Sequence, residues 1–342
     1  LAVLKDELSG KLIKVKAGVI INAAGPWIDP VNRAMGVEKR YIGGTKGSHL
    51  VLDHPELRKA IGDHEFFFEN KDGRIVLIFP FYDKLIVGTS DLPIENADEA
   101  RCTPEEEQYF IDLVARVFPD IKVTPEQIVF RFSGVRPLEY SHAKSAGQIS
   151  RDHTLQEDRL GSTPLLSLVG GKWTSYRAFS EQVADRTLAF LGKARKADTK
   201  PLPIGGGRNY PKTAGQRTEW ISKIAAEGNL ERDAAERLLD RYGTAGLEVA
   251  RFLAGGKDAP LKSLPAYTRR EMEYLTLKEK AVRVDDLLLR RTTIAWLGHT
   301  SRALVEELAE IMGALLGWNG REQKTEVERT LALLKDMHGL VL

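Results

Sequence analysis

Proline is distributed unevenly along this chain of 342 residues, and this limits what its parts can fold into. Thirteen of the fifteen prolines lie at or before Pro211, and only Pro260 and Pro265 follow it. Because proline interrupts a helix interior, the last third is the part that can form long helices. The glycines Gly205–Gly207 predict a linker over residues 196–210. Beyond it, apolar spacing predicts helices over residues 216–227, 231–242, 247–253, 270–282, 285–297, 301–316 and 321–337.

The part before this linker has the pattern of a mixed α/β fold. Residues 12–22 are rich in β-formers and predict a buried strand whose end meets a ligand. A helix is predicted from Pro104 to Val117, because Thr103 and Glu106 have the spacing of a capping box. Short β-rich runs separated by turns predict an antiparallel sheet, with strands over residues 48–52, 65–69, 74–79 and 84–87.

Charge and cysteine content exclude several classes of protein. Fifty Lys and Arg residues against 48 Asp and Glu residues give a net charge of +2, which argues against a nucleic-acid binder. The single cysteine, Cys102, excludes an internal disulfide and a thiolate metal cluster, and it suits a reducing compartment. The histidines lack ligand spacing, so we predict no metal site. No uncharged stretch approaches the roughly 18 residues of a membrane span.

One glycine segment resembles a nucleotide-binding loop without matching it. No G-x-G-x-x-G follows a predicted strand. Gly170, Gly171 and Lys172 resemble the end of a phosphate loop, but Leu166 stands where such a loop has its first Gly and Trp173 stands where it needs Ser or Thr, so we reject a phosphate loop. The preceding apolar run predicts a strand that ends here, with a helix beginning near Thr174. Unpaired backbone N–H groups at such a turn predict an anion or flavin site, and a plain strand-to-helix turn is the alternative.

Arg136 stands between Val135 and Pro137, two residues after Gly134. The following proline holds Arg136 in an extended conformation. An extended arginine in this setting predicts bidentate binding of a phosphate or a carboxylate. An ordinary salt-bridged surface arginine is the alternative.

Six segments together resemble the flavin-dependent glycerol-3-phosphate dehydrogenases. They are residues 21–27 (INAAGPW), 44–49 (GTKGSH), 85–91 (LIVGTSD), 132–138 (FSGVRPL), 150–155 (SRDHTL) and 170–177 (GGKWTSYR). They occur in the family's order with similar spacing, and residues 285–292 (DDLLLRRT) resemble part of its helical C-terminal domain. The family's first βαβ unit, which carries G-x-G-x-x-G, has no counterpart here. The chain therefore resembles the C-terminal portion of such an enzyme.

The resemblance implies an α/β fold followed by an all-α C-terminal domain. Residues 1–37 and 140–195 would form the remainder of an FAD-binding domain. Residues 38–139 would form an antiparallel substrate-binding domain. Residues 196–210 would be the linker, and residues 211–342 the α-helical domain.

The resemblance also implies a reaction. The family oxidises sn-glycerol 3-phosphate at C2 to dihydroxyacetone phosphate, transfers hydride to FAD and passes the electrons to quinone. By this resemblance, His49 is the candidate base near the substrate hydroxyl. Arg136, Arg151 and Lys172 would bind the phosphate, and Arg136 and Lys172 are also candidate catalytic residues at the developing oxyanion. Thr89 would line the substrate pocket, with a turn-capping role as the alternative.

FAD is the cofactor that the resemblance implies. The small residues Ala24 and Gly25 would allow the backbone to approach it closely. The second glycine turn would face the flavin with Gly170, Gly171, Lys172, Trp173 and Thr174. The dipole of the following helix would favour an anionic reduced flavin.

The resemblance further implies a cytoplasmic protein on the inner face of the cell membrane, and a homodimer. Arg290 and Arg291 could contact anionic lipid, although a solvated helix face is the alternative. Three other functions stay open. The first is an oxygen-reducing glycerol-3-phosphate oxidase, and the second is a related flavoprotein that oxidises an amino acid and needs a carboxylate clamp. The third is a non-catalytic binding or assembly fragment, which the missing G-x-G-x-x-G favours.

Overall fold

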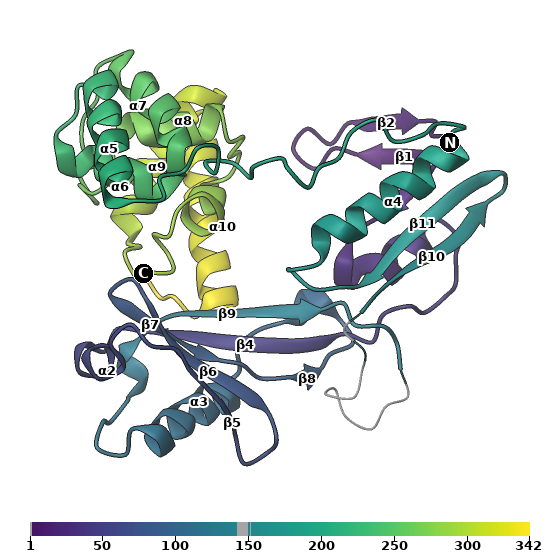
Figure 1. The fold of residues 1–342 in the computed structure, drawn as a ribbon, viewed down its shortest axis with the longest axis horizontal. Coiled ribbons are helices and arrows are strands. Elements are labelled where there is room, and N and C mark those ends of the chain that lie inside the picture. Colours follow the sequence, from purple (N-terminus) through teal and green to yellow (C-terminus); the bar gives the residue numbers. More distant parts are fainter. Residues whose placement is uncertain (1, 142–149, 151) are drawn as a thin grey trace.

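A six-stranded antiparallel sheet, the large sheet, dominates the computed structural model, which describes residues 2–141, 150 and 152–342 (Figure 1). Its strand order is β5-β6-β7-β4-β8, and β9 also pairs with β4. Its strands are β4 (Thr45–Leu52), β5 (Phe66–Glu69), β6 (Ile75–Phe81), β7 (Lys84–Gly88), β8 (Leu92–Pro93) and β9 (Ile128–Arg136). The four predicted strands are confirmed, and the structure adds β8 and β9.

The side chains of β4 show which apolar core each face of the large sheet packs against. Successive side chains of a strand point to opposite faces. Leu50 and Leu52 join an apolar core with the helices α2 (Pro55–Ile61) and α3 (Pro104–Val117). The predicted α3 is confirmed together with its capping box. Val51 belongs instead to the core of the C-terminal helices. The large sheet is therefore covered by helices on both faces.

A second sheet, the small sheet, has the order β10-β11-β3. Its strands are β3 (Ile20–Asn22), β10 (His153–Leu160) and β11 (Thr163–Gly170). β11 runs antiparallel to β10 and parallel to β3. The 3₁₀ turn η1 (Gly25–Trp27) and the helix α1 (Ile28–Ala34) follow β3. The helix α4 (Tyr176–Phe190) packs on the small sheet through Phe179 and Val183.

The single strand predicted over residues 12–22 is wrong. The structure divides it into β2 (Leu12–Val15), which forms a hairpin with β1 (Ala2–Lys5), and β3. Residues 16–19 form no strand, and they lead the chain from the hairpin to the small sheet. β-propensity runs through both strands, so only their different pairing partners reveal the break.

The C-terminal helices form a separate layer, the helical domain. Its helices are α5 (Ala214–Gly228), α6 (Arg232–Tyr242), α7 (Gly246–Ala254), α8 (Arg269–Leu277), α9 (Arg302–Leu316) and α10 (Gly320–His338). The helices predicted over residues 270–282 and 285–297 are wrong in extent. α8 ends at Leu277, and the second region contains only a π-helical turn, η6 (Asp286–Arg291), followed by tight turns.

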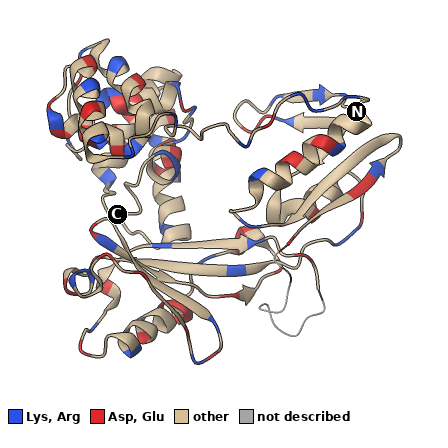
Figure 2. Cartoon of the chain, in the orientation of Figure 1, with Lys and Arg blue, Asp and Glu red and all other residues tan. Residues whose placement is uncertain are grey.

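The long helix α10 joins the helical domain to the large sheet, and Figure 1 shows it reaching β9. His338, near its end, places Nδ1 2.7 Å from the carbonyl oxygen of Arg131 on β9. Asp336 pairs with Arg101 at 2.7 Å. Lys and Arg side chains are interspersed with Asp and Glu side chains over the two sheets and the helical domain (Figure 2).

Candidate active site

Two glycines on neighbouring strands leave room for the side chains of the site. His49 on β4 is paired with Gly88 on β7, and a Cβ at Gly88 would lie 2.1 Å from His49 Cδ2. Gly47, two residues before His49, lies under the guanidinium of Arg136. A Cβ at Gly47 would lie 2.5 Å from both Arg136 Nη atoms. Any side chain at either glycine would therefore displace a predicted functional group.

His49 is held against an aromatic ring in an apolar setting. Its imidazole lies parallel to Phe132 of β9, with the ring centroids 4.7 Å apart. Among the described residues, its buried Nδ1 atom has no hydrogen-bond partner. Burial, and after it the charge of Arg136, lower the pKa of His49 from 6.5 to about 4. His49 is therefore neutral at pH 7.

Arg136 reaches the end of β7 with both arms of its guanidinium. Nη1 forms an ion pair with Asp91 at 3.1 Å, and Nη2 donates to Thr89 Oγ1 at 3.1 Å. Both arms also lie 3.4 Å from the carbonyl oxygen of Ser90. The structure thus brings the predicted residues His49, Thr89 and Arg136 together. Asp91 is the carboxylate partner of Arg136 in this group.

A buried ion pair lies on the opposite face of β4 and supports this strand end. Lys46 Nζ lies 2.7 Å from Glu106 on α3, and both side chains are almost fully buried. Glu106 also accepts a hydrogen bond from Ser90 Oγ, which itself accepts from the N–H of Ser48 at 2.8 Å. Burial acts to raise the pKa of Glu106, but its hydrogen bonds to Lys46 and Ser90 outweigh burial and lower it.

This network was not predicted from the sequence. Lys46 lies in the segment of residues 44–49, and Glu106 was predicted only as a capping residue. A lysine on the same strand as an apolar run, at even spacing from Leu50 and Leu52, was the signal that it points into the core.

The remaining candidate residues lie where two parallel strands end. β3 and β11 pair with Asn22 opposite Ser167, so the segments that follow them lie at the same edge of the small sheet. Gly25 and Gly170 have φ values of +59° and +74°, which favour glycine. A Cβ at Gly170 would lie 2.3 Å from the carbonyl oxygen of Asp152. Close backbone packing therefore requires glycine at Gly170.

Asn22 holds the first of these turns in place. It was not among the predicted site residues. Its Nδ2 donates to the carbonyl oxygen of Ile28 at 3.0 Å and to Asn32 Oδ1 at 2.8 Å. Its Oδ1 accepts from the N–H of Ala24 at 3.1 Å. A buried amide in an otherwise apolar strand was the available signal, because such a group needs hydrogen-bond partners.

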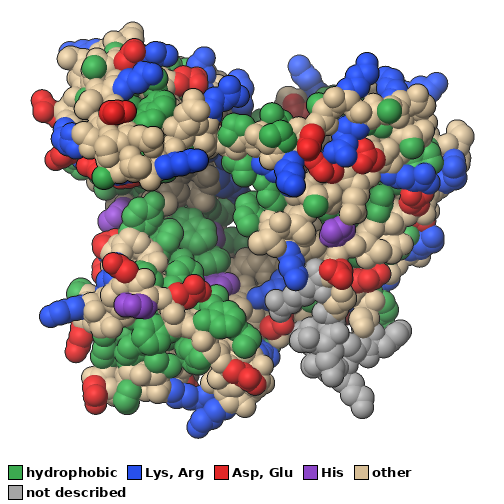
Figure 3. All heavy atoms as spheres, viewed as in Figure 1, with side chains coloured by type: hydrophobic (Ala, Val, Ile, Leu, Met, Phe, Trp, Pro, Cys, Tyr) green, Lys and Arg blue, Asp and Glu red, His purple; other side chains and the backbone are tan. Residues whose placement is uncertain are grey.

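A backbone hydrogen bond connects the turn at the edge of the small sheet to the strand end that carries Arg136. The N–H of Gly170 donates to the carbonyl oxygen of Pro137, the residue after Arg136, at 3.0 Å. Figure 3 shows the molecule hollowed where the large sheet, the small sheet and the helical domain meet, with apolar side chains gathered there. The end of β11 is thus anchored to the strand that carries Arg136.

The side chains after Gly171 point to solvent. Lys172 and Thr174 are exposed, and Trp173 is 87% exposed with its ring stacked on Tyr176 at 5.5 Å. The helix expected near Thr174 begins at Tyr176. The prediction of unpaired N–H groups at this turn is wrong for Gly171 and Lys172, because they donate to the carbonyl oxygen of Asp152 and to Ser175 Oγ. Arg151 lies outside the described residues. Within those residues, no helix has the length and apolar composition needed to cross a membrane.

Two family models match this chain. The model described as "FAD dependent oxidoreductase" matches residues 2–177, slightly more than half of the 342 residues. The model described as "C-terminal domain of alpha-glycerophosphate oxidase" matches residues 197–323. The first match ends at the start of α4, and the second begins within the segment between α4 and α5.

Curated relatives and a solved structure agree with these matches. A "Probable glycerol-3-phosphate dehydrogenase, mitochondrial" of Dictyostelium discoideum is 29% identical, covering 98% of this chain and 53% of the relative. An "Aerobic glycerol-3-phosphate dehydrogenase" of Staphylococcus haemolyticus is 31% identical, covering 90% of this chain and 57% of the relative. The chain therefore spans a little over half the length of these relatives.

The crystal structure of the glycerol-3-phosphate dehydrogenase from Bacillus halodurans, complexed with FAD, has the same fold. Its TM-score is 0.77 at 23% identity, covering 98% of this chain and 65% of that one. The predicted α/β fold with a helical C-terminal domain is confirmed by this similarity and by the arrangement of the two sheets. Since the first family model matches more than half of its residues, this chain belongs to the FAD-dependent oxidoreductase family.

Proposed function

We propose that this chain carries the substrate-binding part of an FAD-dependent glycerol-3-phosphate dehydrogenase. The observation that carries the proposal is the placement of a neutral imidazole and a guanidinium side by side on two glycines. His49 lies on Gly88, and Arg136 lies on Gly47. A base beside an anion-binding group can bind an alcohol that also bears a phosphate: the base accepts the hydroxyl proton, and the guanidinium binds the phosphate. The names of the curated relatives support this substrate.

The edge of the small sheet fits a large planar cofactor. Around Gly25, a Cβ would meet nothing within 4 Å, so the backbone there is open to a ligand. The exposed ring of Trp173 stands at the same edge, after β11. The residues that would hold FAD are Ala24, Gly25, Gly170, Gly171, Lys172, Trp173 and Thr174. When bound, FAD supplies the hydride acceptor for the C2 hydrogen of the substrate.

His49 would take the proton of the substrate's C2 hydroxyl. Its lowered pKa keeps the ring unprotonated at neutral pH, so it is ready to accept a proton. Because Nδ1 is buried and lacks a partner in the described part of the chain, we assign this proton to Nε2. A phosphate dianion beside Arg136 would offset the guanidinium charge, raise the pKa of His49 and make it a stronger base.

Arg136 would bind the substrate phosphate through its planar guanidinium. It now pairs with Asp91, so the phosphate would compete with this carboxylate or share the guanidinium with it. A dianion favours more than one cation, and Lys172 and Arg151 are the candidates for the others. Thr89, whose Oγ1 accepts from Arg136, would fix the direction of the guanidinium.

The proposal extends to the electron acceptor, the location and the assembly. Quinone as the acceptor, a cytoplasmic protein on the inner face of the membrane, and a homodimer all rest on the resemblance. Reduction of a soluble quinone under nitrogen supports quinone as acceptor. If hydrogen peroxide forms in air as fast as the quinone is reduced under nitrogen, this result would support the oxidase instead.

An anaerobic absorption spectrum tests the central proposal. The purified chain is mixed with FAD, and the 450 nm band is recorded before and after glycerol 3-phosphate is added. We expect this band to bleach with glycerol 3-phosphate and to persist with glycerol, which lacks the phosphate. Bound flavin that glycerol 3-phosphate does not bleach would contradict the proposal.

A binding measurement isolates the role of Arg136 from the flavin. By calorimetry, Arg136→Ala should weaken binding of glycerol 3-phosphate at least about tenfold, because a charge-assisted hydrogen bond contributes about 1.5–3 kcal/mol. Arg159→Ala, on the small sheet, is the matched control and should bind as the parent does. Equal affinity of the parent and Arg136→Ala would exclude this role.

A further inference from the structure

A series of aromatic rings connects His49 to the helical domain. His49 stacks on Phe132 with an interplanar angle of 2°. Trp296 of the helical domain also packs on Phe132, with centroids 4.5 Å apart and the rings tilted by 51°, and it lies 5.2 Å from Phe130. Phe132 is therefore in contact both with His49 and with the helical domain.

The turn after η6 fixes the direction of Trp296. The indole Nε1–H donates to the carbonyl oxygen of Leu289 at 3.3 Å. Thr292 Oγ1 donates to the carbonyl oxygen of Leu287 at 2.7 Å, and the N–H of Ala295 donates to that of Leu288 at 3.3 Å. Carbonyl groups of the π-helical turn thus bind the residues that follow it.

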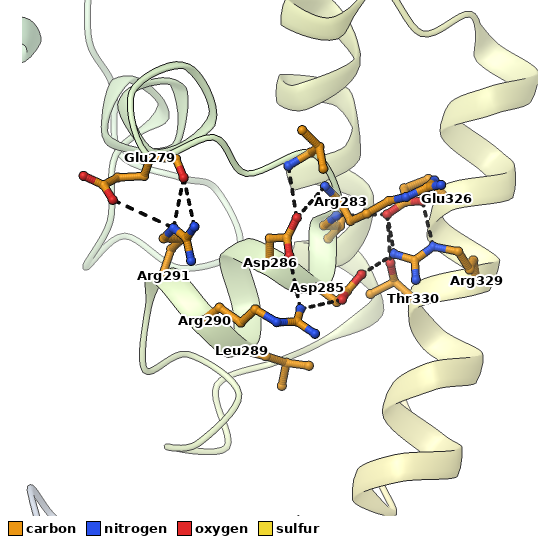
Figure 4. A network of polar contacts seen from close by, with 12 residues as sticks. Glu279, Arg283, Asp285, Asp286, Leu289, Arg290, Arg291, Glu326, Arg329 and Thr330 are labelled. Carbon is orange, nitrogen blue, oxygen red and sulfur yellow. Dashed lines mark hydrogen bonds and ion pairs between the residues drawn. The ribbon is translucent and has the colours of Figure 1, made fainter. Parts of the chain in front are cut away.

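Ion pairs between two buried carboxylates and partly exposed arginines hold η6 itself (Figure 4). Asp285, 4% exposed, pairs with Arg290 at 2.8 Å and also with Arg329 of α10. Glu326, 3% exposed, pairs with Arg329 at 2.7 Å and with Arg283 at 2.9 Å. Figure 4 shows these groups gathered between η6 and α10, with Leu289 on the same turn. The carbonyl that orients Trp296 therefore belongs to a segment fixed by charged groups.

We propose that Trp296 is a positioning residue for His49, acting through Phe132. The indole keeps the Phe132 ring in one orientation, so the imidazole stays flat above Gly88 and shielded from water. This inference rests on the proposed function only in assigning His49 to the substrate. The role of Trp296 itself is a statement about the geometry and solvation of His49.

The solvation of His49 offers a direct readout. Of the elements packed against the imidazole, β9 contributes the charged Arg136 and the ring of Phe132, and β7 contributes Gly88. Removing the indole would let Phe132 turn and water reach the imidazole. Since burial is the largest cause of its low pKa, hydration should move the pKa of His49 towards 6.5.

The experiment is a ¹H–¹³C NMR titration of the histidine Cε1–H signals in the full chain, with His49 assigned from the spectrum of His49→Gln. In Trp296→Leu we expect His49 to bind protons about tenfold more tightly or better, which is one pKa unit. We also expect weaker contacts between the His49 and Phe132 ring protons. Trp220→Phe, in the same domain, is the matched control and should leave both readouts unchanged.

A milder variant decides the case if Trp296→Leu does not fold. Trp296→Phe keeps a ring but loses the N–H donor to Leu289, and it should give an intermediate rise in proton affinity. A folded Trp296→Leu, or failing that Trp296→Phe, with the parent's titration and ring contacts would overturn the inference. The titration needs neither flavin nor substrate, so failure of flavin bleaching would count against the proposed function alone.

Discussion

Gly88 and His49 are so close that the imidazole occupies the space of a side chain at position 88. A Cβ there would lie 2.1 Å from His49 Cδ2 and 2.7 Å from Nε2. The backbone of Gly88 is not in the left-handed region, so conformation alone does not demand glycine. The neighbouring imidazole is the reason that a glycine is needed there.

Gly88→Ala should therefore displace the imidazole while leaving the large sheet intact. In the flavin-loaded protein we expect kcat/KM for glycerol 3-phosphate to fall about 100-fold, because a shift of about 1 Å is enough for such a loss. Gly134→Ala on β9 is the control, since a Cβ there meets nothing within 4 Å. Parental kcat/KM in a folded Gly88→Ala protein would show that His49 is not positioned by this contact.

Asp91→Asn should change anion binding in the opposite direction from Arg136→Ala. The substitution removes the negative charge 3.1 Å from Arg136 Nη1 while retaining a similar shape. We expect glycerol 3-phosphate to bind several-fold more tightly, because the phosphate no longer competes with a carboxylate. Calorimetry at two salt concentrations measures this effect. Unchanged or weaker binding would place the phosphate away from Arg136.

Lys46→Met should destabilise the fold more than it alters the chemistry. The substitution leaves the carboxylate of Glu106 buried without its cation, which costs about 3–5 kcal/mol of unfolding free energy. The double variant Lys46→Met/Glu106→Gln should recover part of the loss, because the buried charge is then removed. Urea unfolding followed by circular dichroism measures both. Lys59→Met, at an exposed position on α2, is the control and should unfold as the parent does.

The ion pairs around η6 should make the helical domain sensitive to acid. Burial opposes ionisation of Asp285 and Glu326, but hydrogen bonds from Arg329 and other arginines outweigh it and lower both pKa values. The folded state then binds fewer protons than the unfolded state, so stability falls as the pH drops below about 4.5.

The variant Asp285→Asn tests the predicted direction of this change of stability with pH. At pH 7 the variant should be less stable than the parent, and the difference should shrink as the pH falls and Asp285 becomes protonated. Thermal unfolding at pH 7, 4.5 and 3.5 measures the difference. A gap that widens in acid would mean that Asp285 does not hold a lowered pKa in the folded protein.

The sequence predicted His49 as a site residue, but its lowered pKa could be found only from the structure. The segment of residues 44–49 indicated His49 as a candidate base with an ordinary pKa. Its lowered pKa depends on burial and on Arg136, which lies 87 positions later. The same holds for Arg136, whose extended conformation follows from Pro137. Its partner Asp91 follows only from the strand order.

The sequence by itself determined the features that depend on near neighbours. The capping box of α3, the separation of a mixed α/β part from a helical part, and the glycine turns after β3 and β11 all follow from local spacing. Periodicity and caps act over one or two turns of chain, so such features can be read without the fold.

Only the tertiary structure decided which distant groups meet. It separated β2 from β3, joined Lys46 to Glu106, and placed Trp296 against Phe132, the ring on which His49 stacks. Local spacing can indicate that a side chain such as Lys46 is buried, but its partner depends on the packing of elements tens or hundreds of residues apart. The sequence is thus enough to predict which residue types form the site. Their protonation and orientation arise from burial and charge that exist only once the layers are packed.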